Sequence, residues 1–136
     1  MKNLHPQSYF KEAIRYYQNS KGLLKTTKTN LGVYVDTKPV REACSTCYLA
    51  VLNAINGYLL QYGVEREKLP KSFDEYLRAL KKFSQKDGNL MKYFNLVYHE
   101  LHVLGYYRDD LYAVDMVKVA FGNAKYIIEH ITGRKL

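Results

Sequence analysis

Apolar residues recur at every third or fourth position along most of the 136-residue chain, which is the spacing of one face of an α-helix. The pattern predicts helices over about 6–27, about 40–62, from Ser72 to a turn at 86–89, over about 90–104, and from Asp109 or Asp110 to about 131. In the first of these, the apolar stripe consists of Phe10, Ala13, Ile14, Tyr17 and Leu24. The alternation of apolar and polar residues typical of a β-strand is not sustained in any segment, so we expect no sheet.

Residues at the ends of these segments indicate the same division. Ser72 can cap its helix, because Glu75 lies three residues further on and completes a capping box. Three glycines stand where a helix is expected to end: Gly63, Gly105 and Gly133. The connection over 27–39 is long for a link between helices, and its apolar run at 33–35 predicts a compact loop that packs on the bundle.

The length of the chain fits one domain, and we therefore predict a single all-α domain over 1–136, an antiparallel four- to five-helix bundle. The helix at 40–62 carries apolar groups on both sides, which indicates a central position. Its most apolar run, at 48–62, is shorter than the roughly 20 residues of a membrane-spanning helix. The first residues contain no apolar stretch of the kind that marks a secretory signal peptide. We expect a cytoplasmic protein with no membrane partner.

Positive charge is concentrated in the first third of the chain. The formal net charge is +8, and residues 1–41 contribute +6 of it, with eight Lys or Arg against two acids. A basic region attracts phosphate groups or an acidic partner, and nucleic acid is therefore a possible partner. The candidate phosphate-binding residues are Lys11, Arg15, Lys25, Lys28 and Arg108. The alternative is a solvated helix face followed by a basic loop.

Two short motifs resemble metal or redox sites. Cys44 and Cys47 have the spacing of half a zinc site, but the chain contains no second cysteine pair. Both fall on the apolar side of a helix, where small core residues are expected. His99 and His102 are three residues apart, whereas the helical zinc motif places its histidines four apart. We therefore expect no metal and no cofactor.

His102 and the tyrosines are the remaining candidates. His102 borders the apolar stripe of its helix, close to Tyr98 and Tyr106, so it is either a hydrogen-bonded structural residue or an acid–base group. The chain has 14 Tyr but only 5 Phe and no Trp. Tyrosine suits half-exposed seams and interfaces. A second stripe in the last helix, formed by Tyr112, Val119 and Tyr126, is the candidate dimer face; the alternative is a seam within the molecule.

Two stretches resemble the HEPN-like helical bundles, and in particular a small bacterial family of HEPN-like proteins with no assigned function. The matching features are Asp36-x-Lys38-x-Val40, the run Tyr98-x-x-Leu101-His102, Gly105-Tyr106 and Ile127-Ile128, within 35–60 and 98–131. The resemblance implies an all-helical bundle that is often dimeric and is sometimes linked to RNA cleavage or to nucleotide-modifying partners.

The nuclease branch of that superfamily carries an arginine followed, after four to six residues, by a histidine. Arg108 occupies the plausible place for the arginine, but positions 113–115 hold no histidine, and His102 precedes Arg108 instead. The resemblance therefore leaves catalysis unsupported, with His102 and Arg108 as the only candidates.

Together these observations predict a non-catalytic helical module that acts by protein association, as a homodimer or with another protein. The alternative is an RNA- or nucleotide-binding domain, or a degenerate HEPN-type ribonuclease. A bundle that binds a small molecule is a third possibility, for which the sequence suggests no ligand.

Overall fold

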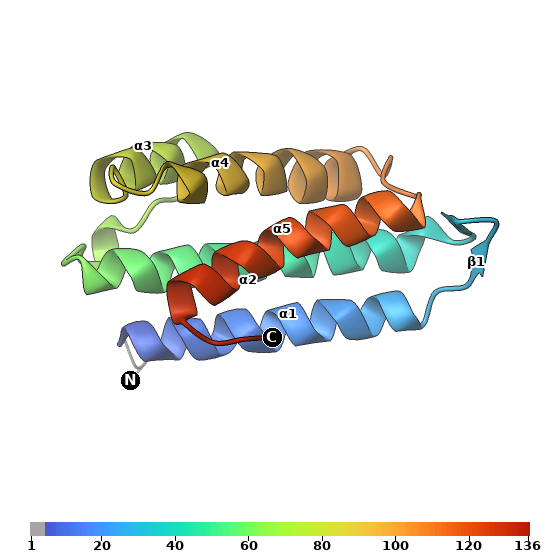
Figure 1. Cartoon of the computed structure of the whole chain (residues 1–136), viewed down its shortest axis with the longest axis horizontal. Helices are drawn as coiled ribbons and strands as arrows, with labels where there is room; N and C mark the ends of the chain where they lie inside the picture. Colours follow the sequence, from blue (N-terminus) through green and yellow to red (C-terminus); the bar gives the residue numbers. More distant parts are fainter. Residues whose placement is uncertain (1–4) are drawn as a thin grey trace.

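The computed structural model describes residues 5–136 and shows a bundle of antiparallel helices with one small hairpin (Figure 1). The helices are α1 (Pro6–Lys25), α2 (Thr37–Gln61), α3 (Phe73–Phe83), α4 (Gly88–Val97) and α5 (Val114–Thr132). Two further helical segments, the short 3-10 turn η1 (Arg66–Lys68) and the π-helix η2 (Tyr98–Tyr107), and two strands, β1 (Thr29–Asn30) and β2 (Val33–Tyr34), complete the order. The prediction of an all-α bundle is confirmed in this broad form.

The elements form three layers, with α2 in the middle layer (Figure 1). The first layer is α1, the second contains α2 and α5, and the third contains α3, α4 and η2. The central helix α2 packs against α1, η2 and α5. Its small residues allow this close approach: an added Cβ at Gly57 would lie only 2.5 Å from Cε1 of Phe10 in α1.

By length and composition, α2 could cross a membrane, since its 25 residues include an 18-residue window with a mean hydropathy of 1.3. Eleven of its residues are buried inside the bundle, among them Val40, Cys47, Ile55 and Leu59. Burial between neighbouring helices on several sides accounts for the apolar composition of α2, as the sequence pattern indicates for a central helix.

The expectation of no sheet is wrong, because the connection between α1 and α2 contains a β-hairpin. In β1 and β2, Thr29 pairs with Tyr34 and Asn30 pairs with Val33 in antiparallel register. Each strand has two residues, too few to show the alternation by which a strand is recognised in a sequence. The inner residue Tyr34 is buried, so the expectation of a loop that packs on the bundle is confirmed for this segment.

The sequence pattern predicts that a helix ends at Gly105, and this prediction is wrong. The helical segment continues to Tyr107. From Val97 onward α4 widens into the π-helix η2 without a break in the chain direction (Figure 1). Gly105 is buried where η2 crosses α2, and an added Cβ there would lie 2.6 Å from Sγ of Cys44. The glycine serves the contact between two helices rather than a C-terminal cap.

The last helix also begins later than predicted. Neither Asp109 nor Asp110 caps α5, because its N-cap is Ala113. Asp109 has a positive φ of 54°, and its carboxylate accepts a hydrogen bond of 3.3 Å from the Thr37 hydroxyl at the start of α2. The segment before α5 is held against the hairpin and α2, so the helix starts only after that contact has ended.

The cap of α3 by Ser72 is confirmed, and it gives a testable expectation for stability. The Glu75 carboxylate contacts the Ser72 hydroxyl rather than the backbone N–H that a capping box would use. The Ser72 hydroxyl accepts a hydrogen bond from the backbone N–H of Glu75 and donates one to the Glu75 carboxylate, both at 3.2 Å. Ser72→Ala is expected to lower the free energy of unfolding by about 1 kcal/mol, since it removes this cap. Chemical denaturation measures the change, and Ser72→Asp, which retains a capping oxygen, serves as the control. Equal losses in both variants would show that the cap does not stabilise α3.

Candidate functional site

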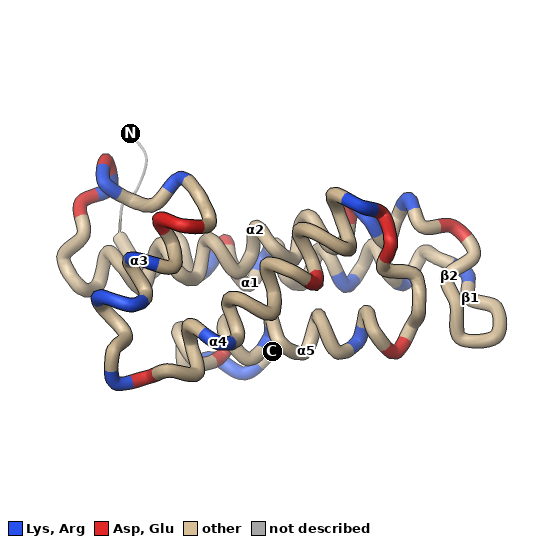
Figure 2. Tube along the Cα trace, turned by 90° about the horizontal axis from the view of Figure 1, so that it is seen from above, with Lys and Arg blue, Asp and Glu red and all other residues tan. Residues whose placement is uncertain are grey.

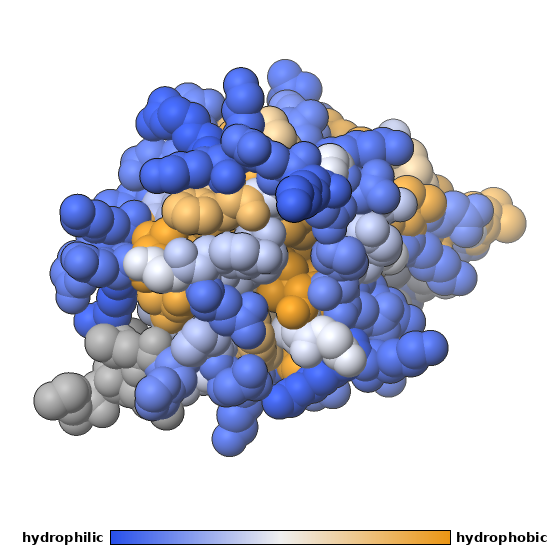
Figure 3. Space-filling model, turned by 60° about the vertical axis from the view of Figure 1, so that its left-hand side comes forward, coloured by the Kyte–Doolittle hydropathy of each residue, from blue (hydrophilic) through white to orange (hydrophobic). Residues whose placement is uncertain are grey.

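Most of the large apolar side chains exposed to solvent lie at the end of the molecule that carries the hairpin. Leu31, Val33 and Val35 are exposed in and beside the hairpin, and Tyr112, Met116 and Val119 are exposed at the start of α5. We call these six residues the hairpin–α5 surface. In Figure 3, hydrophobic side chains reach the right-hand edge of the view, where the hairpin projects. Apolar exposure gathered in one place is typical of an interaction site.

Backbone hydrogen bonds join the two halves of this surface. Val33 forms a β-bridge with Ala113, and the Tyr34 N–H donates to the Tyr112 carbonyl at 2.9 Å. The Val114 N–H donates to the Gly32 carbonyl, also at 2.9 Å. The hairpin and the first turn of α5 therefore form one continuous structure, although some 80 residues separate them in the sequence.

The tip of the hairpin places a leucine in an unfavourable conformation. Leu31 has a φ of +51° and Gly32 a φ of +78°, the pair of positive values that a type I′ turn requires. Glycine, asparagine and aspartate suit these positions, whereas a leucine there costs about 1–2 kcal/mol in backbone strain. Leu31 is also 96% exposed, so no contact within the described structure compensates for the strain. Strained, exposed residues of this kind are found at functional sites.

On α5 the surface follows one row of the helix. Met116 and Val119 are three residues apart and 55% and 58% exposed. Gly122 is three residues further along the same row, and an added Cβ there would meet no other atom within 4 Å. A glycine inside a helix costs about 0.5–1 kcal/mol relative to alanine. Packing within the described part of the chain does not explain this one.

The three residues of the predicted dimer face do not share one environment. Tyr112 is 52% exposed but precedes α5, and Val119 is exposed on the helix. Tyr126 is partly buried and stacks on Tyr93 of α4, with ring centroids 4.1 Å apart. The structure therefore brings Tyr112 and Val119 to the hairpin–α5 surface and places Tyr126 in a seam within the molecule.

His102 is the centre of a stack of rings along η2. Its ring lies 5.0 Å from that of Tyr48, 5.4 Å from that of Tyr98 and 6.0 Å from that of Tyr106. The Arg41 guanidinium closes the stack, 5.1 Å from the Tyr106 ring, and its Nε donates to the Tyr106 carbonyl at 2.7 Å. Among the described residues, the side chain of His102 contacts these rings but makes no hydrogen bond, so the hydrogen bond expected of a structural histidine is not seen.

Arg108 does not join His102 in a common site. It follows η2 as its C-terminal cap residue and is exposed, and among the described residues its side chain makes no hydrogen bond or ion pair. The arginine that contacts the histidine stack is Arg41, which is not among the candidates predicted from the sequence. Arg41 reaches the stack because α2 packs against η2, and no local sequence motif predicts that contact.

The other basic candidates divide into two groups. Lys11 and Arg15 line one hollow of about 470 Å³ on α1, together with Tyr9 and Tyr16. Lys25 is the last residue of α1 and Lys28 lies beside the hairpin. Lys and Arg occur at both ends and along the helices rather than on one face (Figure 2). The five candidates therefore do not form a single phosphate-binding site.

The cysteine pair lies in the core, where small apolar residues were expected. Cys44 and Cys47 are fully buried and not joined by a disulfide. Burial raises the pKa of the Cys44 thiol to about 12, and burial likewise raises the pKa of Cys47 far above its usual range. The described residues include no group of three or more His, Cys, Asp or Glu side chains placed to hold a metal ion.

These thiols are expected to be unreactive in the folded protein. At pH 8 almost none of either side chain is ionised, and the thiolate is the nucleophile. Iodoacetamide at pH 8 should leave both cysteines unmodified in native protein and modify both in denaturant, as measured by mass spectrometry. Rapid modification of the native protein would contradict the core position of the pair.

Comparison with known proteins relates the chain to a solved structure and to a family. A solved structure of a protein of unknown function from Dyadobacter fermentans is 30% identical and superposes with a TM-score of 0.79, covering 96% of this chain and 99% of that chain. No curated protein matches the sequence. The family described as Domain of unknown function (DUF5618) matches residues 8–133, which is nearly the whole chain. The protein therefore belongs to the DUF5618 family.

Proposed function

We propose that the protein is a non-catalytic association module that pairs with a second copy of itself through the hairpin–α5 surface. The proposal is carried by two observations: the backbone hydrogen bonds join the hairpin to the start of α5, and both elements expose large apolar side chains there, namely Leu31, Val33, Val35, Tyr112, Met116 and Val119. Burial of apolar side chains is the main driving force of such association.

The row on α5 favours a second copy as the partner. A twofold interface brings the same patch of two subunits together, so positions equally far from the axis meet. With the axis at Val119, Met116 of one subunit faces the partner's Gly122. The open space above Gly122 can receive a long methionine side chain, and the glycine then has a reason to occur inside a helix.

The resemblance to HEPN-like bundles supports the same proposal, because those proteins are often dimeric. The HEPN-like relationship, a bacterial origin and a cytoplasmic location belong to this proposal as well, as expectations from the sequence. The stack around His102 supports a structural role, since its rings pack on one another and on Arg41.

Sedimentation equilibrium tests the association directly. The protein is expected to sediment at twice the monomer mass of 15.9 kDa at micromolar concentration. The double variant Met116→Lys/Val119→Lys should sediment as a folded monomer, because it places two charges in the centre of the interface. Leu96→Lys on α4, also an exposed apolar residue, is the matched control and should leave the dimer intact. A wild-type monomer at every concentration would refute the proposal.

A second candidate function is the binding of single-stranded RNA by the hollow on α1. Tyr9 and Tyr16 stand there beside Lys11 and Arg15, and aromatic rings with basic groups form stacking sites for single strands. The Arg15 guanidinium lies 5.2 Å from the Tyr16 ring and is also paired with Glu12, which neutralises part of the local charge. That pairing makes this function the weaker candidate.

Fluorescence anisotropy with a labelled oligouridine tests the second function. Affinity should fall steeply between low and moderate salt and should weaken further in Lys11→Glu. Lys118→Glu on α5 is the matched charge reversal outside the hollow. An affinity that does not change with salt concentration, or that falls equally in Lys11→Glu and Lys118→Glu, would exclude this site.

A further inference from the structure

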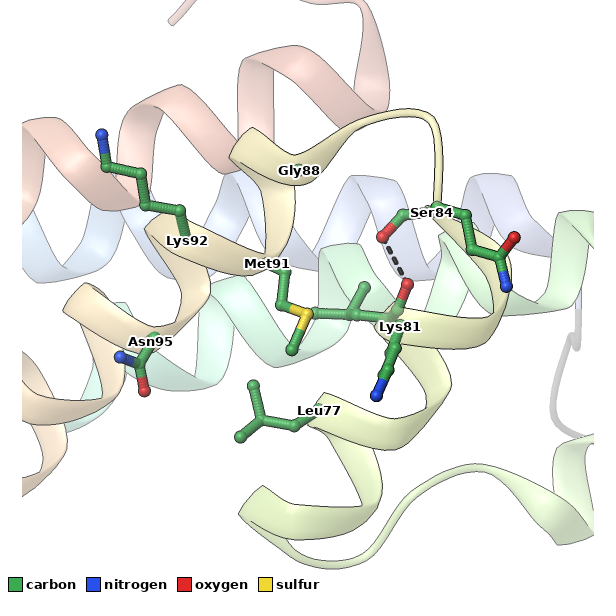
Figure 4. A pocket seen from close by; sticks show the side chains of 9 residues that line it. Leu77, Lys81, Ser84, Gly88, Met91, Lys92 and Asn95 are labelled. Atoms are coloured by element: carbon green, nitrogen blue, oxygen red, sulfur yellow. Dashed lines mark hydrogen bonds between the residues drawn. The ribbon is translucent and has the colours of Figure 1, made fainter.

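A groove between α3 and α4 lies outside the surfaces described so far. Its volume is about 540 Å³, and its floor is formed by the partly exposed side chains of Leu77 and Met91 (Figure 4). The Ser84 hydroxyl at its side is already bonded to the Leu80 carbonyl, so it offers no free donor to a ligand. In Figure 4 the Met91 side chain lies between the two helices, above Leu77. Methionine adapts its shape to a bound apolar group at low cost.

The margins of the groove are basic. Lys81 on α3 and Lys92 on α4 line it, and among the described residues that line it there is no Asp or Glu. The segment 81–92 holds four lysines and a single acid, Asp87. That carboxylate is already paired with the His130 ring of α5. The groove therefore combines an apolar floor with margins of uncompensated positive charge.

The dimensions and openness of the groove suit a helix. Its walls, α3 with 11 residues and α4 with 10, are each about 15 Å long. Gly88 at the start of α4 leaves open space, since an added Cβ there would meet no atom within 4 Å. A groove of this kind receives the apolar face of an amphipathic helix, with anchor residues at i, i+3 or i+4, and i+7.

We propose that the groove between α3 and α4 binds an acidic amphipathic helix of a partner protein. The apolar anchors of that helix contact Leu77 and Met91. Carboxylates on both sides of its apolar face then lie near Lys81 and Lys92, and this charge complementarity selects the partner. The inference is independent of the pairing of two copies, since the groove and the hairpin–α5 surface lie on different elements.

Two synthetic helical peptides test this inference against the full-length protein. Both carry the same leucines on one face and have a length of about three helical turns. One has glutamates on both sides of that face, and the other has lysines in their place. Fluorescence anisotropy is expected to show binding of the glutamate peptide, with at least about tenfold weaker binding of the lysine peptide.

Variants then locate the binding site. Lys81→Glu/Lys92→Glu should lower the affinity for the glutamate peptide by about tenfold or more and raise the affinity for the lysine peptide. The matched control Lys21→Glu/Lys25→Glu makes the same charge change on α1, outside both candidate sites, and should alter neither affinity by more than about twofold. Both residues of the first pair are exposed at the groove margin, so circular dichroism should show intact helices in each variant.

Several results would overturn the inference. Equal binding of both peptides would show that the surface is merely apolar and selects no charge. The absence of binding by the glutamate peptide, or an unchanged affinity in Lys81→Glu/Lys92→Glu, would remove the site. Binding of an oligouridine that is lost in that variant, without binding of the peptide, would assign the lysines to nucleic acid instead.

Discussion

Gly105→Ala is expected to lower the free energy of unfolding by about 1–3 kcal/mol, the usual range for overpacking a close contact. The added Cβ would lie 2.6 Å from Sγ and 2.7 Å from Cβ of Cys44, and 3.2 Å from the Glu100 carbonyl. Cys44 is fully buried in α2 and cannot turn into solvent, so α2 and η2 must move apart. The higher helix propensity of alanine, worth about 0.5–1 kcal/mol, offsets only part of this loss.

Gly22→Ala makes the same chemical change where no neighbour opposes it. Gly22 lies in α1, is exposed, and would meet no atom within 4 Å of an added Cβ. This variant is expected to be more stable than the wild type by up to about 1 kcal/mol. Urea-induced unfolding of both variants measures whether each substitution raises or lowers the free energy of unfolding. An unchanged slope of this free energy against urea concentration would show that the unfolded states are comparable. A neutral or stabilising Gly105→Ala would contradict the close approach of α2 and η2.

The helices were predictable from the sequence because their signals are local. A stripe of apolar residues, a Ser72–Glu75 box and a glycine after Tyr62 each act within a few residues. The function of Gly105 was not predictable, since a glycine at the end of an apolar stripe looks the same whether it ends a helix or contacts another one. Only the position of Cys44 on a different helix distinguishes the two.

The candidate surface was visible in part. Tyr112 and Val119 stood out because they lie off the apolar stripe of the last helix, and the structure places both at the hairpin–α5 surface. The stacking of Tyr126 on Tyr93 depends on how α4 and α5 cross, and the spacing of apolar residues in the sequence does not predict that crossing. The position of Leu31 in a hairpin turn was not predicted, because the two flanking strands are too short to show an alternation of apolar and polar residues. The signal available was its place between Asn30 and Gly32, where a turn favours a polar residue.

Leu31→Asn is expected to stabilise the fold and to weaken the dimer at the same time. Asparagine followed by glycine is the preferred pair for a type I′ turn, and it adopts a positive φ with little strain. The gain in the free energy of unfolding should be about 0.5–1 kcal/mol for the monomer, part of the strain that leucine carries at φ +51°. Loss of an exposed apolar anchor should raise the dissociation constant of the dimer about tenfold or more.

The opposite signs separate a functional role of Leu31 from a structural one. A residue that stabilises its own fold would lose stability on substitution, and a residue without any role would leave the dimer unchanged. Leu49→Asn removes another exposed leucine, 45% accessible, in the middle of α2 and outside the hairpin–α5 surface, and should leave the dissociation constant as it is. Sedimentation equilibrium measures association, and urea unfolding at a concentration where the protein is monomeric measures the fold. A stabilised variant that dimerises as tightly as the wild type would show that the strained leucine does not contact the second copy.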